Sequence, residues 1–237
     1  MPRLLHHISA RYHHREWATG FRDGSQAFAE IRDKSRTDTH LIVHIQGPDV
    51  SKGIDKDIGA GVSKNSVSRY MDALRRINII DDIPAWHPAL RSPVRLRQGA
   101  KRHLADPSLA VALLGANPES LASDPKTLGL LFESLVLHDL KVYAAANDSS
   151  VSHYHDADDL EVDAVIHRRD GTWIAVEVKL GSPQIPEASA NLLRLERKLV
   201  ERGEKPPAAK LIVIGFGMPV HTTPEGIIVA PVDTLAP

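Results

Sequence analysis

The chain has 237 residues, with 29 Lys plus Arg, 30 Asp plus Glu, 13 His and no Cys. A hydrophobic fraction of 42% and a charged fraction of 25% are ordinary for a globular protein and exclude a collagen-like, coiled-coil or mostly disordered chain. The absence of Cys excludes disulfides, iron–sulfur clusters and Cys-ligated zinc sites. The longest charge-free apolar stretch near the end, residues 211–220, is about half of the ~20 residues that a membrane-spanning helix needs, and the first residues do not form a secretory leader. We therefore expect a soluble cytoplasmic protein that does not associate with a membrane.

The charges are unevenly distributed along the chain. Residues 1–105 carry 18 basic and 11 acidic groups, whereas residues 106–237 carry 11 basic and 19 acidic groups. A basic half followed by an acidic half indicates two modules with different partners. Solvated faces that happen to differ in charge explain the same numbers equally well.

Residues 1–38 form an N-terminal extension that the sequence does not assign to a fold. It contains two His pairs, His6–His7 and His13–His14. A four-His metal site is the less favoured interpretation, because paired surface His residues are common and no surrounding pattern supports a site.

Residues 39–120 are expected to form a winged-helix domain. A short helix in residues 54–62 ends at a Gly turn, and Ser63 then provides an N-cap for a second helix. The second helix has one apolar face, made by Val67, Tyr70, Met71, Leu74 and Ile77. Two helices joined by a tight Gly turn form a helix-turn-helix. The extended segments at residues 79–86 and 92–98 would follow it as the wing.

The opposite face of this second helix is polar and basic, and it is the candidate DNA-binding surface. Its residues are Lys64, Asn65, Ser66, Arg69, Arg75 and Arg76. Such side chains on a recognition helix contact DNA, but the same face is equally suited to a protein interface.

Residues 121–237 are expected to form a second, mixed α/β domain. A short apolar helix in residues 108–116 precedes it, and residues 117–125, rich in Pro, Ser and Asp, are interpreted as the linker between the domains. A long helix (127–147) comes next, then two strands (160–168 and 172–180) joined by a turn at Asp170–Gly171. A second long helix (186–203) and two further strands (209–216 and 226–232) complete the pattern.

The strand at residues 172–180 places charged side chains on one face. Alternation puts Ile174, Val176, Val178 and Leu180 on a core face, and Ala175, Glu177 and Lys179 on the other. In the preceding strand, alternation separates Val162, Ala164 and Ile166 from Glu161, Asp163 and Val165. If the two strands form a hairpin, the carboxylates of Asp163 and Glu177 come close together.

Glu133 supplies a third carboxylate, because it lies within the apolar stripe of the long helix, where an unpaired Glu is rare. Three carboxylates beside Lys179 suit Mg²⁺ or Mn²⁺, which would activate a water for attack on a phosphodiester. Two simpler interpretations remain: Glu177 and Lys179 form a structural ion pair on a half-exposed strand, and Glu133 bonds to backbone near a helix N-terminus. A further cluster, containing His153, His155, Asp156, Asp158 and Asp159, is better explained as a solvated acidic turn than as a metal site.

The order of Glu133 on a helix, Asp163 on a strand and Glu177-Val178-Lys179 on the next strand resembles the PD-(D/E)XK nuclease superfamily. The resemblance implies an αβββαβ core, here with a short extra strand near residues 151–154. The segments GLLFESLVLHDLKVYA and LEVDAVIHRRDGTWIAVEVKLG are also similar to a C-terminal domain of unknown function in prokaryotic AAA+ ATPase-like proteins. In that family a winged helix precedes the nuclease-like domain. The similarity covers roughly residues 39–232.

The resemblance implies a metal-dependent nuclease-like protein with Glu133, Asp163, Glu177 and Lys179 as catalytic residues, the first three as metal ligands, and DNA as the favoured nucleic-acid partner. The chain departs from the family in having no G-x-x-x-x-G-K-[ST] motif, so we expect no ATP site. An ATPase partner or self-association is then conceivable. Two non-enzymatic interpretations stay open: a regulatory or interaction module with a vestigial site, and a winged-helix transcription regulator.

Overall fold

The computed structural model describes residues 64–88, 99–215 and 217–236. The N-terminal extension, the His pairs, the first helix of the expected helix-turn-helix, Ser63 and the extended segment at residues 92–98 lie outside these ranges. The described part begins with helix α5 (Lys64–Arg76), strands β1 (Ile80–Ile83) and β2 (Lys101–Leu104), and helices α6 (Pro107–Leu114) and α7 (Pro118–Ser123).

In the remaining elements, each of two long helices is followed by three strands. They are α8 (Pro125–Ala146), β3 (Ser150–His155), β4 (Glu161–His167), β5 (Trp173–Lys179), α9 (Ile185–Glu201), β6 (Ala209–Ile214), β7 (His221–Thr222) and β8 (Ile227–Pro231). Short 3₁₀ turns at Ser182–Gln184 and Val232–Thr234 complete the list. No helix in the described ranges is long and apolar enough to cross a membrane.

Six of the strands form one mixed sheet in the order β3-β4-β5-β6-β8-β7. Strand β4 is antiparallel to both β3 and β5, whereas β5, β6 and β8 run parallel. The parallel step from β5 to β6 passes through α9, as a crossover helix must. The expected mixed α/β class is therefore confirmed.

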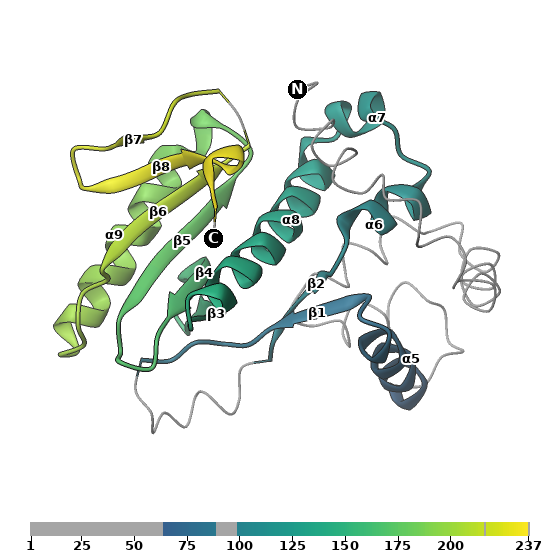
Figure 1. Ribbon diagram of the computed structural model, residues 1–237, viewed down its shortest axis with the longest axis horizontal. Helices are drawn as coiled ribbons and strands as arrows, with labels where there is room; N and C mark the ends of the chain where they lie inside the picture. Colours follow the sequence, from purple (N-terminus) through teal and green to yellow (C-terminus); the bar gives the residue numbers. More distant parts are fainter. Residues whose placement is uncertain (1–63, 89–98, 216, 237) are drawn as a thin grey trace.

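Two long helices cover the two faces of this sheet, so its central strands are buried on both sides (Figure 1). Helix α8 packs Phe132, Val136 and Leu140 against Val176 and its neighbours on one face. On the other face, α9 contributes Ala188, Leu192, Leu195 and Leu199. The expected alternation in β5 is correct, but its second face is not half-exposed, because Ala175 and Glu177 are buried under α9.

The local signals at the helix and turn boundaries explain why α8 and the β4–β5 hairpin form where they do. Asp124 caps α8 by accepting a hydrogen bond from the Thr127 backbone N–H (3.1 Å), and Pro125 occupies the first turn, where its missing N–H has no cost. In the hairpin, the Asp170 carboxylate accepts from Thr172 N–H (2.8 Å), and Gly171 has a φ of 82°, which favours glycine.

The expected linker at residues 117–125 is wrong in one respect, because it contains helix α7. Asn117 and Ser120 form a reciprocal capping box, and Pro118 opens the helix. Leu121 is buried in a cluster that also holds Ile79, Leu104, Leu128 and Leu131. The Pro- and Ser-rich composition therefore reflects helix capping, and a small apolar core connects the segments on either side of it.

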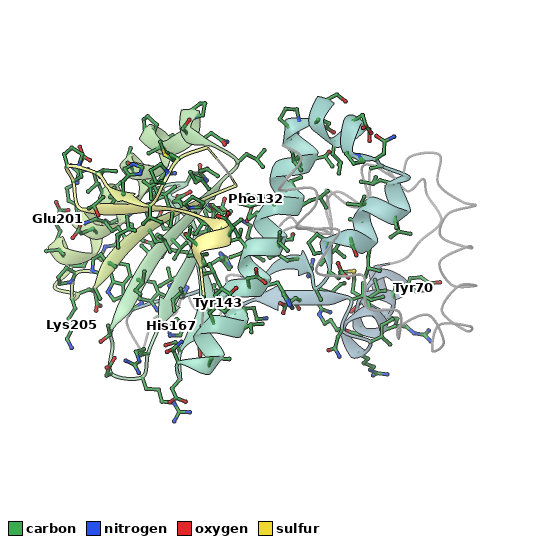
Figure 2. The ribbon with its side chains drawn as sticks, turned by 45° about the horizontal axis from the view of Figure 1, so that its top comes forward. Tyr70, Phe132, Tyr143, His167, Glu201 and Lys205 are labelled. Atoms are coloured by element: carbon green, nitrogen blue, oxygen red, sulfur yellow. The ribbon has the colours of Figure 1, made fainter. Side chains whose placement is uncertain are left out.

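Helix α5 and the β1–β2 pair lie beside α8 (Figure 1), and Ile83 of β1 is buried with residues of α8 and of the six-stranded sheet. Strands β1 and β2 are antiparallel, with Ile80 opposite Leu104 and Ile83 opposite Lys101. Among the described residues, the partner of β1 in this pair is residues 101–104, a strand that the sequence did not predict. On the expected apolar face of α5, Met71 is buried, but Tyr70 and Ile77 are 67% and 58% exposed. Figure 2 shows Tyr70 at the edge of the molecule.

Candidate functional site

Strands β4 and β5 bring three of the predicted site residues together. The Lys179 Nζ lies 3.1 Å from Asp163 Oδ2 and 2.5 Å from Glu177 Oε2. Asp163 Oδ2 also accepts a hydrogen bond from the Val178 backbone N–H at 2.8 Å. The Asn191 amide of α9 donates to Glu177 Oε1 at 3.3 Å. The hairpin thus places one ammonium between two carboxylates.

A β-bulge in β4 orients Asp163. The pairs Ser152↔Val165 and Tyr154↔Val162 leave two residues of β4 opposite one residue of β3. The extra residue breaks the strict alternation, so Val162 and Val165, predicted on opposite faces, are buried in the same cluster. The pairing of β4 with β5 ends at Ala164↔Val176. Beyond it, the Asp163 carboxylate accepts a hydrogen bond from the backbone N–H of Val178. Bulges of this kind often aim a side chain at a site.

Glu133 joins the cluster through a residue that the sequence analysis missed. The Lys101 Nζ, from β2, lies 2.7 Å from Glu133 Oε1, 2.8 Å from Glu161 Oε1 and 3.9 Å from Asp163 Oδ1. Glu133 and Asp163 therefore contact the same ammonium. Their oxygens Oε1 and Oδ1 are separated by no more than the sum of their distances from the Lys101 Nζ. Glu133 lies in the middle of α8, so the interpretation as an N-terminal helix carboxylate is wrong.

The cluster is largely shielded from solvent, and its charges are strongly coupled. Burial and the Asp163 carboxylate raise the pKa of Glu177 to about 8, against the opposing effect of Lys179. Burial, then Asp163, also raises the pKa of Glu133. For Asp163, burial opposes ionisation, but Lys179, Lys101 and the Val178 N–H together hold its pKa below the ordinary value. Asp163 is thus the most firmly ionised of the three.

Both lysines remain charged in this setting. Burial alone would lower the pKa of Lys101, but Glu133, Asp163 and Glu161 raise it above its ordinary value. Asp163 and Glu177 outweigh burial in the same way and raise the pKa of Lys179. Two ammonium groups therefore face four carboxyl groups, and burial, followed by the Asp163 carboxylate, is what raises the pKa values of Glu133 and Glu177.

Clustered carboxylate oxygens are the ligands that a hard divalent cation such as Mg²⁺ or Mn²⁺ prefers. Within the ranges that the structure describes, however, no group of three or more His, Asp or Glu side chains stands ready to hold a metal ion. The two ammonium groups lie between the carboxylates instead. The donor chemistry thus fits a metal, whereas the arrangement of the side chains is that of a lysine-bridged cluster.

The histidine next to this cluster is not a candidate general base. His103 is buried, and its Nδ1 lies 3.3 Å from the Ser134 hydroxyl of α8. Burial, followed by the charge of Lys101, lowers the pKa of His103 to about 3. The ring is therefore neutral, and it has too little proton affinity to take a proton from water.

The acidic turn at residues 156–159 is a structural feature. The Lys198 ammonium of α9 pairs with both Asp156 and Asp158, and the Tyr154 hydroxyl donates to Asp156 at 3.0 Å. Asp156 also accepts backbone N–H groups from Asp158 and Leu160. These bonds fasten the β3–β4 turn to α9.

The predicted DNA-binding residues differ in their availability. Arg75 is held by Asp82 (2.7 Å) and Asp72 (2.9 Å), so its guanidinium joins α5 to β1. Arg69 and Arg76 are exposed. Lys64, Asn65 and Ser66 lie in the first turns of α5, but their side chains are outside the described part of the structure.

Comparison with known proteins divides the chain into two segments. Residues 128–235 match the model of a domain of unknown function, DUF4143. Residues 25–120 match a second domain of unknown function, DUF8612. These segments are similar to uncharacterised families. No curated protein and no solved structure matches the chain. All the carboxylates of the site fall within residues 128–235, whereas Lys101 falls within residues 25–120.

Proposed function

We propose that the chain is a metal-dependent nuclease-like protein that hydrolyses phosphodiester bonds. The observation that carries the proposal is the buried cluster in which Glu133, Asp163, Glu177 and Lys179 meet. The element order α8-β3-β4-β5-α9-β6 supports a PD-(D/E)XK-like core, since it corresponds to the αβββαβ order of that superfamily. On this assignment β3 is the first of the three strands rather than an extra one.

Glu133, Asp163 and Glu177 would hold Mg²⁺ or Mn²⁺ through their carboxylate oxygens. Such an ion, when bound, lowers the pKa of a water molecule and neutralises charge on the phosphate. In the hydrolysis, a water oxygen bonds to phosphorus, the bond from phosphorus to one ester oxygen breaks, and that oxygen leaves with a proton. Lys179, an ammonium fixed by two carboxylates, stabilises the negative charge that develops on the phosphate oxygens.

The proposed substrate is DNA, bound by a winged helix built from α5 and the β1–β2 pair. A helix followed by a two-stranded antiparallel pair is consistent with this arrangement. Exposed Arg69 and Arg76 would contact phosphates, while Arg75 positions α5 against β1. An ATPase partner remains a prediction from the resemblance alone.

The direct test of the enzyme proposal is metal binding and cleavage by one preparation. The wild-type chain should bind Mn²⁺ in a calorimeter and nick plasmid DNA with Mn²⁺ but not with EDTA. Asp163→Asn should lose both properties and keep its fold, because the Asn carbonyl can still accept the Val178 N–H. Glu196→Gln, which alters a carboxylate paired with Lys210, is the control and should behave as wild type.

A non-enzymatic interaction module is the second candidate function. It is favoured by the two lysines, which already occupy the spaces between the carboxylates. If wild type and Asp163→Asn give the same heat with Mn²⁺, or neither gives any, the metal-dependent nuclease is excluded and this candidate replaces it.

The DNA-binding part of the proposal is tested with two Arg pairs. Arg69→Ala with Arg76→Ala should weaken binding to random duplex and reduce the slope of log affinity against log salt by about 2, because each phosphate contact contributes about one unit. Arg168→Ala with Arg169→Ala removes two exposed charges from the β4–β5 turn, at the other end of β4 from Asp163. This control pair should change neither the affinity for duplex DNA nor the slope of its salt dependence. Gel shifts at several salt concentrations measure both, and a folded wild type that shifts no duplex at low salt would disprove DNA binding.

A further inference from the structure

Lys101 stands where the carboxylates of two other elements converge. Its ammonium contacts Glu133 of α8, together with Glu161 and Asp163 of β4, at 2.7, 2.8 and 3.9 Å. Two of these three, Glu133 and Asp163, are among the carboxylates that the proposed nuclease would use to hold its metal. The ammonium therefore occupies part of the space in which a cation would be bound.

The contacts of Lys101 distinguish it from the other paired lysines. Lys141 pairs with Asp81 and Lys210 pairs with Glu196, both away from the cluster. Lys198, which fastens the β3–β4 turn to α9, pairs with two carboxylates, and neither of them belongs to the proposed site. Lys101 pairs with three carboxylates, and its side chain is only 12% exposed.

An ammonium and a divalent cation cannot share these ligands at low cost. Two positive charges about 4 Å apart, near a protein surface, repel by several times the thermal energy. The lysine side chain has four rotatable carbon–carbon bonds and is strongly hydrated in water, so its head can leave the cluster if another cation replaces it. The segment that carries Lys101 and the segment that carries the carboxylates match two different family models.

We propose that Lys101 is a built-in competitor for the metal, so that a divalent cation binds Glu133 and Asp163 only by displacing the Lys101 ammonium. Strand β2 of the N-terminal segment thereby sets the metal affinity of the C-terminal site. This inference rests on the proposed function, since it concerns the metal site of that same nuclease. It adds a residue outside the α/β domain to the site and gives that residue an inhibitory role.

The test is Lys101→Met, which keeps most of the side-chain volume and removes the charge. Calorimetry should show Mn²⁺ binding to this variant at least about tenfold more tightly than to wild type, a difference of about 1.4 kcal/mol. Lys210→Met is the matched control, because Lys210 has a similarly buried side chain (13% exposed) and a single carboxylate partner away from the cluster. Its Mn²⁺ affinity should equal that of wild type.

Thermal melts give a second readout that does not depend on activity. Without metal, Lys101→Met leaves Glu133, Glu161 and Asp163 facing one another, so it should melt below wild type. Saturating Mn²⁺ should raise its melting temperature more than that of wild type. If the Met variant does not fold without metal, Lys101→Gln, which keeps two N–H donors, replaces it in both measurements.

The possible outcomes separate the inference from the proposed function. Equal or weaker Mn²⁺ binding by Lys101→Met, with wild type binding Mn²⁺, overturns the competition and leaves the nuclease proposal intact. If neither wild type nor Lys101→Met binds Mn²⁺, both proposals are wrong. Tight binding by Lys101→Met together with weak binding by wild type supports the competition, whether or not the protein cleaves DNA.

Discussion

Replacing Lys179 with Met should lower Mn²⁺-dependent DNA cleavage by at least about 100-fold while Mn²⁺ binding is retained. Lys179 is a cation and cannot be a metal ligand, so its loss does not remove a donor atom from Glu133, Asp163 or Glu177. Removing one group that stabilises developing charge in a shielded site typically costs two to three orders of magnitude in rate. Plasmid nicking and calorimetry on the same preparation measure the two effects.

Lys141→Met is the control for this experiment. Lys141 pairs with Asp81 between α8 and β1, so the variant loses an ion pair that joins two elements but leaves the site unchanged. Melts in the presence of Mn²⁺ establish that both variants are folded. Cleavage by Lys179→Met at the wild-type rate would remove Lys179 from the chemistry and reduce its contacts with Asp163 and Glu177 to a structural ion pair.

The parts of the fold that depend on local pattern could be predicted from the sequence. Alternation placed Val176 and Glu177 on opposite faces of β5, and the Asp170–Gly171 signal placed the hairpin turn, because both depend on residues that are neighbours in the chain. The hairpin in turn brought Asp163 near Glu177. The helical stripe that contained Glu133 also placed that carboxylate toward the sheet, since α8 is long and strongly apolar.

Features that depend on contacts between distant segments could not be predicted in this way. The bulge at Asp163 follows from the pairing of β3 with β4, and a single strand carries no signal for an extra residue. Lys101 contacts Glu161 across 60 positions in the chain. One clue was present: three clustered carboxylates need more compensation than the single charge of Lys179 provides. Looking for a second cation would have led to the basic residues of the N-terminal half.

Val176→Asp should unfold the protein or lower its stability by several kcal/mol. Val176 is fully buried beneath α8, where it packs with Phe132 and Val136, and no described cation lies in that apolar cluster. An unpaired charge there is costly because it loses its hydration without gaining a partner. Thermal melts measure the loss, and Ile228→Asp is the control, since Ile228 is a partly exposed residue of β8. Similar melting temperatures for Val176→Asp and wild type would mean that the faces of β5 are wrongly assigned.

Glu177→Gln, one residue away, should instead keep the fold and remove part of the pH dependence of stability. In the folded protein without metal, the pKa of the Glu177 carboxyl is raised from its ordinary value of 4.5 to about 8. The folded state therefore holds this proton more tightly than the unfolded state, so the contribution of Glu177 to stability is full below pH 4.5 and is lost as pH rises through about 8. Between pH 6.5 and 8 the buried His103, with a pKa of about 3, is neutral in both folded proteins, so its contribution to the slope is the same in wild type and in Glu177→Gln and cancels in the comparison. Over this range, denaturant unfolding with EDTA should show the free energy of unfolding of wild type falling with pH by up to about 1.4 kcal/mol per unit more than that of Glu177→Gln. Parallel pH profiles would mean that Glu177 is already ionised in the folded state, and that the lysines neutralise the cluster without any metal.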